Sequence, residues 1–169
     1  AMGSANTLAS SQLLELTGNT VFLAALTSGL VVAIGLLVAY GARVDGGHTV
    51  RVAARVVALG YAVPGSVVAI GVLVALSGLT TLTGVFAGGT IAALVYAYSV
   101  RFGAVSLQTI DAGLLKVSPS MDEAARILGA SRARVLGRVH VPLLRGSLLT
   151  AALLVFVDVM KELPATMIV

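Results

Sequence analysis

The charged residues with the most informative spacing lie near the end of the chain. Asp158, Lys161 and Glu162 interrupt an otherwise apolar segment. Residues three apart share a helix face, so Asp158 and Lys161 can form an ion pair, whereas the adjacent Lys161 and Glu162 cannot. Pro164 disfavours helix at the residue before it. Glu162 is therefore expected to carry a net negative charge that suits passage of a cation; a structural charge cluster is the alternative.

A second group of polar residues lies between residues 118 and 146, in the longest polar interval of the chain. Ser120 and Glu123 have the Ser-x-x-Glu spacing of a capping box, which predicts the start of a helix. Gly129 is typical of a helix end in the left-handed conformation, and Ser131 is a candidate cap for a second short helix. Pro142 is expected to break that second helix and to begin the next apolar segment.

The elements that must position these residues are membrane helices. The 169 residues are 58% hydrophobic and 11% charged, whereas soluble domains are about 45–50% apolar and about 25% charged. The sequence contains no cysteine, which excludes disulfides and thiol catalysis. His48 and His140 have no second histidine at ligand spacing, so no histidine metal site is expected. The sequence predicts an all-α fold, a polytopic transmembrane helical bundle.

Four apolar runs are long enough to cross a membrane as helices. The N-terminal segment 1–18 precedes them and opens with four residues typical of a cloning remnant. The predicted membrane domain is 19–169, with spans at 19–40, 52–76, 85–102 and 147–169 and a polar loop at 103–146. Pro64 and Gly65 lie in the middle of the second span, so we expect that helix to kink or break there.

The placement of basic residues predicts the orientation of the helices. Ten of the eleven Lys and Arg residues lie within 43–55 or 101–145, and none lies within 77–84. Short loops rich in Lys and Arg stay on the cytoplasmic side of a membrane. The two basic intervals, including the loop at 103–146, are therefore predicted to be cytoplasmic, and segment 77–84 to face outward.

The polar loop resembles that of a known family. Asp122-Glu123-Ala124-Ala125, with Gly129 and then His140-Val141-Pro142-Leu143-Leu144, is similar to the Glu-Ala-Ala loop of permease subunits of bacterial ABC importers. In that family the loop forms coupling helices that dock into a cleft of a cytoplasmic ATPase. The resemblance implies the same ATPase-coupling role for Asp122, Glu123, Ala124, Ala125, Gly129 and Pro142. Because the family has another span after the fourth, it also implies a C-terminal half or fragment, truncated at its C-terminus.

The same resemblance implies a set of partners. They are ATP-binding cassette ATPase subunits, a second permease half or subunit, an extracytoplasmic solute-binding protein and membrane lipid, without nucleic acid. The implied location is the bacterial cytoplasmic (inner) membrane. The subunit is expected not to be an enzyme and to bind no cofactor, because ATP and magnesium belong to the partner ATPase. Consistent with this, the sequence has no phosphate-binding Gly-x-x-x-x-Gly-Lys motif.

The last segment narrows the resemblance to ferric iron importer permeases. It contains Lys161-Glu162-Leu163-Pro164-Ala165-Thr166, a run that related permeases for thiamine, polyamines and phosphonates generally lack. Ferric iron is therefore the implied substrate, and those three other substrates are the alternatives. Candidates for the translocation path are Asp158, Lys161, Glu162 and Pro164, and Glu162 is the one candidate metal ligand.

Two other classes of protein fit parts of the sequence. Residues 123–139 resemble a DNA-binding helix-turn-helix with Gly129 at the turn, but a third helix and a soluble core are missing. A channel or secondary transporter that needs no ATPase would fit the helix breaks expected at Pro64 and Pro164, but no internal repeat supports it. Copurification with a nucleotide-binding subunit separates these classes from an ATP-driven importer.

Overall fold

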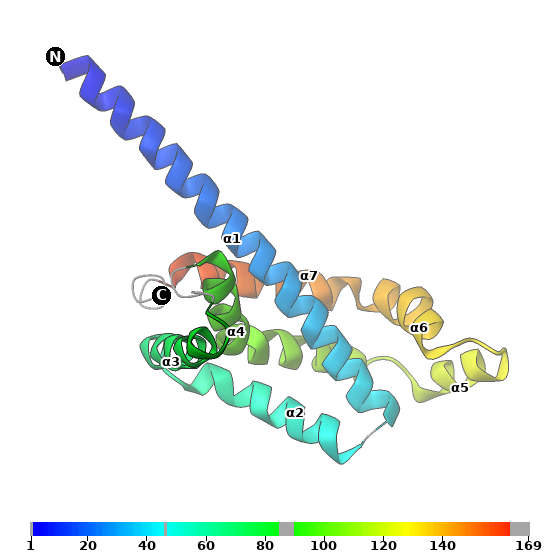
Figure 1. Ribbon diagram of the computed structural model, residues 1–169. Coiled ribbons are helices and arrows are strands. Elements are labelled where there is room, and N and C mark those ends of the chain that lie inside the picture. Colours follow the sequence, from blue (N-terminus) through cyan, green and yellow to red (C-terminus); the bar gives the residue numbers. More distant parts are fainter. Residues whose placement is uncertain (1, 46, 85–89, 163–169) are drawn as a thin grey trace.

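The chain forms a bundle of helices, shown in Figure 1. A computed structural model describes residues 2–45, 47–84 and 90–162, and this part of the chain contains no strand. The helices are α1 (Met2–Asp45), α2 (His48–Leu59), α3 (Gly65–Thr83), α4 (Ile91–Leu114), α5 (Pro119–Ile127), α6 (Arg132–Val135) and α7 (Val141–Lys161). A 3-10 turn at Gly60–Ala62 follows α2, and a π-helical turn at Leu136–His140 joins α6 to α7.

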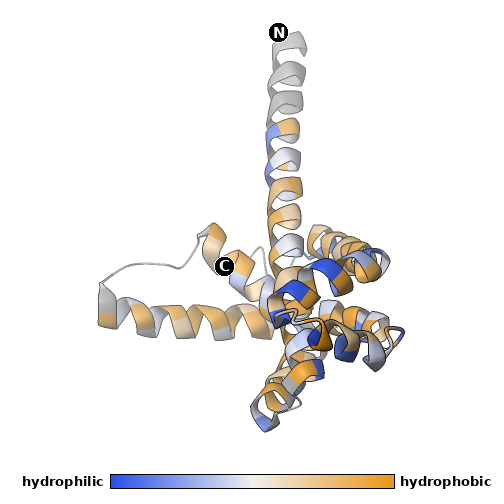
Figure 2. Ribbon diagram, turned by 90° about the vertical axis from the view of Figure 1, so that its right-hand side faces the viewer, coloured by the Kyte–Doolittle hydropathy of each residue, from blue (hydrophilic) through white to orange (hydrophobic). Residues whose placement is uncertain are grey.

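Four helical segments are long and apolar enough to cross a membrane. They are Leu14–Val44, Gly65–Leu82, Ile91–Leu114 and Arg132–Lys161. Figure 2 shows hydrophobic residues around the outer faces of these helices. Exposed side chains such as Phe22, Leu149 and Leu153 are suited to lipid contact. The predicted all-α polytopic bundle is confirmed.

The helices extend further than the apolar runs alone indicate. α3 continues to Thr83, beyond the expected end of the second span, so most of the predicted outward loop at 77–84 is helical. The hydroxyl groups of Ser77, Thr80 and Thr81 donate to backbone carbonyls one turn earlier, which lets these polar residues remain in a helix. α4 likewise continues to Leu114, so the first part of the predicted loop at 103–146 is helical.

The expected break at Pro64 is confirmed. Val63 is extended (φ −88°, ψ 132°), as the residue before a proline prefers to be. After it, α3 points in a very different direction from α2 (Figure 1). α2 alone has 12 residues, about 18 Å at 1.5 Å per residue, which is too short for a hydrocarbon layer of about 30 Å. The predicted second span is thus two helices that meet at an angle.

The core of the bundle is formed by α1, α4 and α7, which pack against one another. Tyr98 and Phe102 of α4 are buried with Val31 of α1 and Val155 of α7. Nearer α5 a second buried cluster contains Ala39, Leu107, Ile110, Leu114, Val117, Leu144 and Ala151. Since lipid tails are as apolar as leucine, close packing rather than exclusion of water must hold these helices together.

Polar side chains add contacts between the core helices. The Ser28 hydroxyl of α1 donates to the Ala152 carbonyl of α7 at 2.7 Å, and the Ser106 hydroxyl of α4 donates to the Val31 carbonyl at 3.3 Å. Bonds of this kind contribute about 0.6 kcal/mol each in a membrane protein. They fix the register of α1 against the other two helices.

Candidate functional site

The helix α5 is the short helix that the Glu-Ala-Ala resemblance singles out. Its N-cap is Ser118, whose hydroxyl accepts from the backbone N–H of Ser120, and Pro119 occupies the first turn. The predicted capping box of Ser120 and Glu123 is therefore wrong, because the helix begins earlier. Pro119 explains the shift: its fixed φ angle suits a first helical turn, where its missing N–H costs no hydrogen bond.

The end of α5 was predicted correctly. Gly129 has φ +73°, in the left-handed region that favours glycine. The N–H of Gly129 donates to the Arg126 carbonyl at 2.9 Å, and the N–H of Ala130 donates to the Ala125 carbonyl at 3.0 Å. These two bonds form a Schellman motif. Ser131 is the N-cap residue of α6 as predicted, although its side chain makes no capping hydrogen bond.

The surface of α5 is open. No residue of the helix is buried, and no other helix packs extensively against it within the described part of the chain. Glu123 and Ala124 are exposed, and Ala125 is partly exposed. At the end of the helix Ile127 and Leu128 are each 86% exposed. Two large apolar side chains beside a tight turn are therefore available to a partner.

One carboxylate attaches α5 to the bundle. Asp122 accepts from Arg43 Nε through Oδ2 at 2.9 Å and lies 2.6 Å from His140 Nε2 through Oδ1. Its side chain is only 14% exposed. Arg43 comes from the end of α1, and His140 from the turn before α7. We call Arg43, Asp122 and His140 the loop cluster.

Arg43 also binds the backbone of the segment that leads into α5. Its Nη1 donates to the Leu114 carbonyl and its Nη2 to the Val117 carbonyl, both at 2.7 Å. These carbonyls lie at the end of α4 and in the turn after it, where the last carbonyl groups of a helix need partners from outside the helix. The Leu114 carbonyl also accepts from the N–H of Val117 at 3.1 Å. The planar guanidinium group provides donors in a fixed geometry that suits several acceptors at once.

His140 is the most enclosed member of the loop cluster. Its side chain is 0% exposed, and the Tyr40 ring of α1 packs against it with the ring centroids 5.0 Å apart. The Tyr40 hydroxyl donates to the Arg132 carbonyl at 3.0 Å. An ionised carboxylate can only accept hydrogen bonds, so His140 Nε2 donates to Asp122 Oδ1, while Nδ1 has no hydrogen-bond partner.

The environment of Asp122 changes its acidity. Burial raises the pKa of this carboxyl group, but hydrogen bonds from Arg43 and His140, together with their charges, lower it more. The net result is a pKa below the ordinary value. The carboxylate therefore stays ionised at neutral pH and holds both partners.

Pro142 was predicted to break the second short helix, and this prediction is wrong. Arg132–Lys161 forms one continuous helical segment. In the π-helical turn before the proline, the N–H of Val141 donates to the Leu136 carbonyl, five residues back. This wider turn accommodates Pro142, whose ring would otherwise meet the carbonyl four residues earlier. The prediction that Pro142 lies in the first turn of the last span is confirmed, since it is near the start of α7.

A second arginine cluster lies at the middle of α4. Arg101 Nε donates to Glu162 Oε2 at 3.1 Å, and Arg101 Nη1 donates to the Val63 carbonyl at 2.6 Å. The Arg101 side chain is 20% exposed and that of Glu162 is 10% exposed. Arg101 is about 15 Å from the start of α4, at 1.5 Å per residue. We call Arg101, Glu162 and the Val63 carbonyl the mid-helix cluster.

The mid-helix cluster corrects two predictions. Arg101 is not at the end of the third span, because α4 runs on to Leu114. Glu162 is not left with an unbalanced negative charge, because Arg101 pairs with it. The predicted pair of Asp158 and Lys161 is confirmed, with Nζ and Oδ1 3.3 Å apart. Pro164 lies outside the described residues.

Close backbone approach makes the mid-helix cluster possible. A Cβ at Gly65, at the start of α3, would meet the Glu162 carboxylate and would lie 3.3 Å from the Arg101 guanidinium carbon. The Tyr98 hydroxyl also points to the Glu162 carbonyl, at 3.5 Å. The break between α2 and α3, the middle of α4 and the end of α7 therefore meet at one point inside the bundle.

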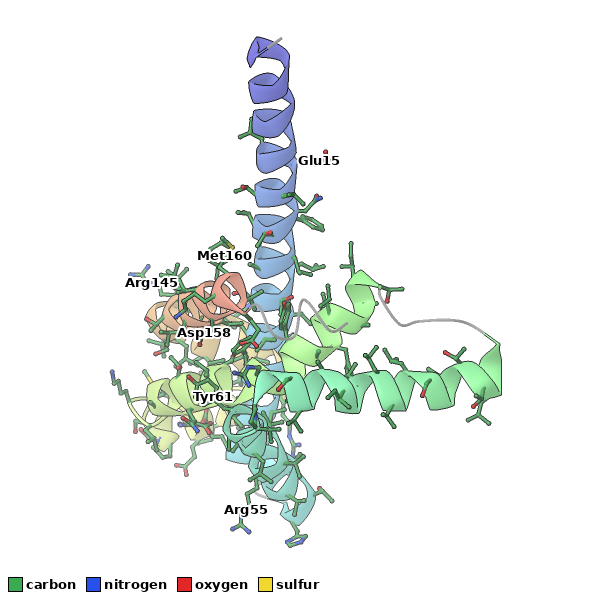
Figure 3. The ribbon with its side chains drawn as sticks, turned by 90° about the vertical axis from the view of Figure 1, so that its left-hand side faces the viewer. Glu15, Arg55, Tyr61, Arg145, Asp158 and Met160 are labelled. Atoms are coloured by element: carbon green, nitrogen blue, oxygen red, sulfur yellow. The ribbon has the colours of Figure 1, made fainter. Side chains whose placement is uncertain are left out.

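Arg55 and Arg145 differ from Arg43 and Arg101 in lying on the outside of the bundle. Figure 3 shows Arg55 and Arg145 pointing away from the bundle, and both side chains are exposed. Among the described residues no group of three His, Cys, Asp or Glu side chains could hold a metal ion. Arg43 and Arg101, by contrast, form ion pairs and backbone hydrogen bonds within the bundle, whereas the sequence placed them only in basic intervals.

A bundle with four candidate membrane spans and one short, exposed helix at its edge defines this chain as a polytopic membrane protein. The chain belongs to the family of inner membrane components of binding-protein-dependent transport systems, whose family model matches residues 14–169. None of the curated proteins matches the chain significantly. Membership makes the chain a transport component of a multi-pass type that works, in general terms, with a solute-binding protein and an ATPase.

Proposed function

We propose that this chain is the permease subunit of an ATP-driven importer and that α5 docks onto its ATPase. The observation that carries the proposal is the exposed apolar end of α5, where Ile127 and Leu128 lie outside the core. This end belongs to the stretch that resembles the Glu-Ala-Ala loop. The Schellman motif at Gly129 holds the two side chains in a defined direction. A preformed helix end loses little conformational freedom on docking.

The charge distribution supports a cytoplasmic position for α5. Lys116 precedes α5, Arg126 lies in its last turn, and Arg43 lies beside it. The arginines at 132, 134, 138 and 145 follow it. Basic residues accumulate on the cytoplasmic side of membrane proteins. ATP and magnesium would bind the ATPase. A second permease half or subunit and an extracytoplasmic solute-binding protein complete the proposed importer.

Substitution of Gly129 tests the docking of α5. A Cβ at Gly129 or at Gly137 would meet no atom within 4 Å, but only Gly129 has a positive φ angle. Gly129→Val therefore strains the backbone, by at least the roughly 1–2 kcal/mol of a left-handed residue, while Gly137→Val does not. We expect Gly129→Val to lose substrate-stimulated ATPase activity in the assembled complex and to insert normally. Stimulation equal to that of Gly137→Val would contradict the docking role.

Ferric iron is the proposed substrate. Support comes from the resemblance of residues 161–166 to ferric iron importer permeases and from charged groups at the end of α7. Asp158, Lys161 and Glu162 are the proposed path residues, with Pro164 as a further candidate from the sequence. Glu162 lies where helices α3, α4 and α7 converge, and intramembrane charges often mark the path of a substrate.

The substrate is tested by the binding protein that activates the complex. The assembled importer in liposomes is supplied in turn with solute-binding proteins loaded with ferric iron, thiamine, a polyamine or a phosphonate, and ATP hydrolysis is measured. We expect stimulation by the iron-loaded protein. Stimulation by one of the other three and not by iron would replace iron as the substrate and leave the permease assignment unchanged.

A further inference from the structure

The loop cluster links α5 to two membrane helices at once. Asp122 of α5 accepts from Arg43 Nε of α1 at 2.9 Å and lies 2.6 Å from His140 Nε2, just before α7. The rest of α5 has no buried residue. Within α5 itself, the Asp122 carboxylate therefore makes the side-chain bonds that link the helix to the bundle.

The last turns of α1 hold both ends of the segment that contains α5. On one side Arg43 binds the Leu114 and Val117 carbonyls, which precede α5. On the other side Tyr40 binds the Arg132 carbonyl, which follows α5, and packs against His140. A displacement of α5 must therefore strain contacts with α1 as well as those with α7.

The chemistry of the cluster makes it stiff. Arg43 uses Nε, Nη1 and Nη2 on three different acceptors, and its planar guanidinium group holds these donors in a fixed geometry. The His140 side chain is 0% exposed and packs against the Tyr40 ring, which limits how far it can follow Asp122 if the carboxylate moves. Hydrogen bonds between ionised partners are about twice as strong as neutral ones.

We propose that Arg43 and His140 are positioning residues that join α5 rigidly to α1 and α7 through Asp122. A force applied to α5 then reaches α1 directly, in addition to its route along the chain through the π-helical turn into α7. The proposal relies on the proposed function only in naming an ATPase as the source of that force. Without Arg43, α5 remains helical but loses its direct bond to α1, so its position relative to α1 becomes less defined.

Spin labels measure this positioning in the chain alone. The sequence has no cysteine, so labels can be attached at Arg126→Cys on α5 and Leu37→Cys on α1, both at exposed positions. The distance distribution between them is recorded by pulsed electron resonance in lipid nanodiscs. We expect one narrow distribution for the otherwise unchanged chain and for Arg138→Ala, which removes an exposed arginine from the same loop. Arg43→Ala is expected to broaden the distribution and remove its main peak.

Two further variants separate positioning from mere stability. Arg43→Lys retains a charge for Asp122 but cannot supply three donors in one plane, so it should restore the main peak in part. Asp122→Asn keeps the shape of the side chain and should broaden the distribution without unfolding the chain. Unchanged distributions in Arg43→Ala and Asp122→Asn, even with lowered melting temperatures, would overturn the proposal. Because no ATPase is present, this result is independent of whether α5 docks one.

Discussion

The loop cluster and the mid-helix cluster use the same chemistry at different depths. In each, an arginine binds a carboxylate and at least one backbone carbonyl near a helix end or a helix break. Arg43 does this at the edge of the bundle, and Arg101 does it in the middle of a membrane helix. Depth should decide how much each arginine contributes, because water can replace lost hydrogen bonds only at the edge.

The difference between the clusters indicates different duties. The loop cluster holds an exposed helix that we propose to move with an ATPase. The mid-helix cluster holds α3, α4 and α7 together. The backbone is extended there at two positions, Val63 before α3 and Glu162 after α7. Irregular backbone at membrane depth requires polar partners from the protein, and Arg101 supplies one to Val63.

Removal of Arg101 should have the largest effect. Arg101→Ala takes the paired charge away from Glu162 at the depth of a membrane helix, and an unpaired charge at the centre of a membrane helix costs about 2.5–3.5 kcal/mol. We expect the free energy of unfolding in mixed micelles to fall by about that amount. Arg101→Lys keeps a positive charge there and should lose less. Equal losses for the two variants would show that charge is not what Arg101 contributes.

Removal of Arg43 should cost less than removal of Arg101. Hydrogen bonds to charged groups contribute about 1.5–3 kcal/mol, and water at the edge of the bundle can reach the freed groups. We expect Arg43→Ala to lower the free energy of unfolding by an amount in that range, measured under the same conditions. Arg138→Ala, at an exposed position, should stay within about 0.5 kcal/mol. A loss for Arg43→Ala that exceeds that of Arg101→Ala would refute the role of depth.

A methyl group at Gly65 tests how tightly the mid-helix cluster is packed. The Cβ of Gly65→Ala would meet the Glu162 carboxylate, and overpacking typically costs about 1–3 kcal/mol. Gly71→Ala is the matched control in the same helix, because its Cβ would meet no atom within 4 Å. The melting temperature should be lowered by Gly65→Ala and unchanged or raised by Gly71→Ala.

Acid should weaken the loop cluster in a defined direction. The pKa of Asp122 is lowered in the folded chain, so the carboxylate stabilises the fold above its ordinary pKa of about 4 and this contribution disappears as the pH falls through the lowered value. The difference in unfolding free energy between the unchanged chain and Asp122→Asn should therefore be present at pH 7 and smaller at pH 3. An equal difference at both pH values would contradict the ion pair.

The features predicted correctly from the sequence are local. Pro64 breaks a helix, Gly129 ends one, and Asp158 pairs with Lys161 because each rule involves neighbouring residues on one element. The all-α membrane fold follows from composition, which needs no knowledge of contacts. The predicted helix bounds were less accurate. Pro119 begins α5 earlier than expected, and the serine and threonine hydroxyls of α3 bond to its backbone, so that α3 ends later than expected.

The two arginine clusters could not be predicted in the same way. Arg43 and Asp122 are 79 positions apart, and Arg101 and Glu162 are 61 positions apart. No local spacing rule connects such residues, because their contact depends on how α1, α4 and α7 pack. The one signal in the sequence was the presence of Arg101 close to an apolar run, where an arginine normally needs a partner.

The most direct test of the account is whether an ATPase covers the end of α5. Single cysteines replace Leu128 at the end of α5 or Arg134 in α6, both exposed positions, and the rate of maleimide labelling is measured with and without the cognate ATPase subunit. The account predicts that the ATPase protects the thiol at 128 strongly and the thiol at 134 much less. Labelling of both thiols at unchanged rates in a complex that still contains the ATPase would contradict the docking role of α5.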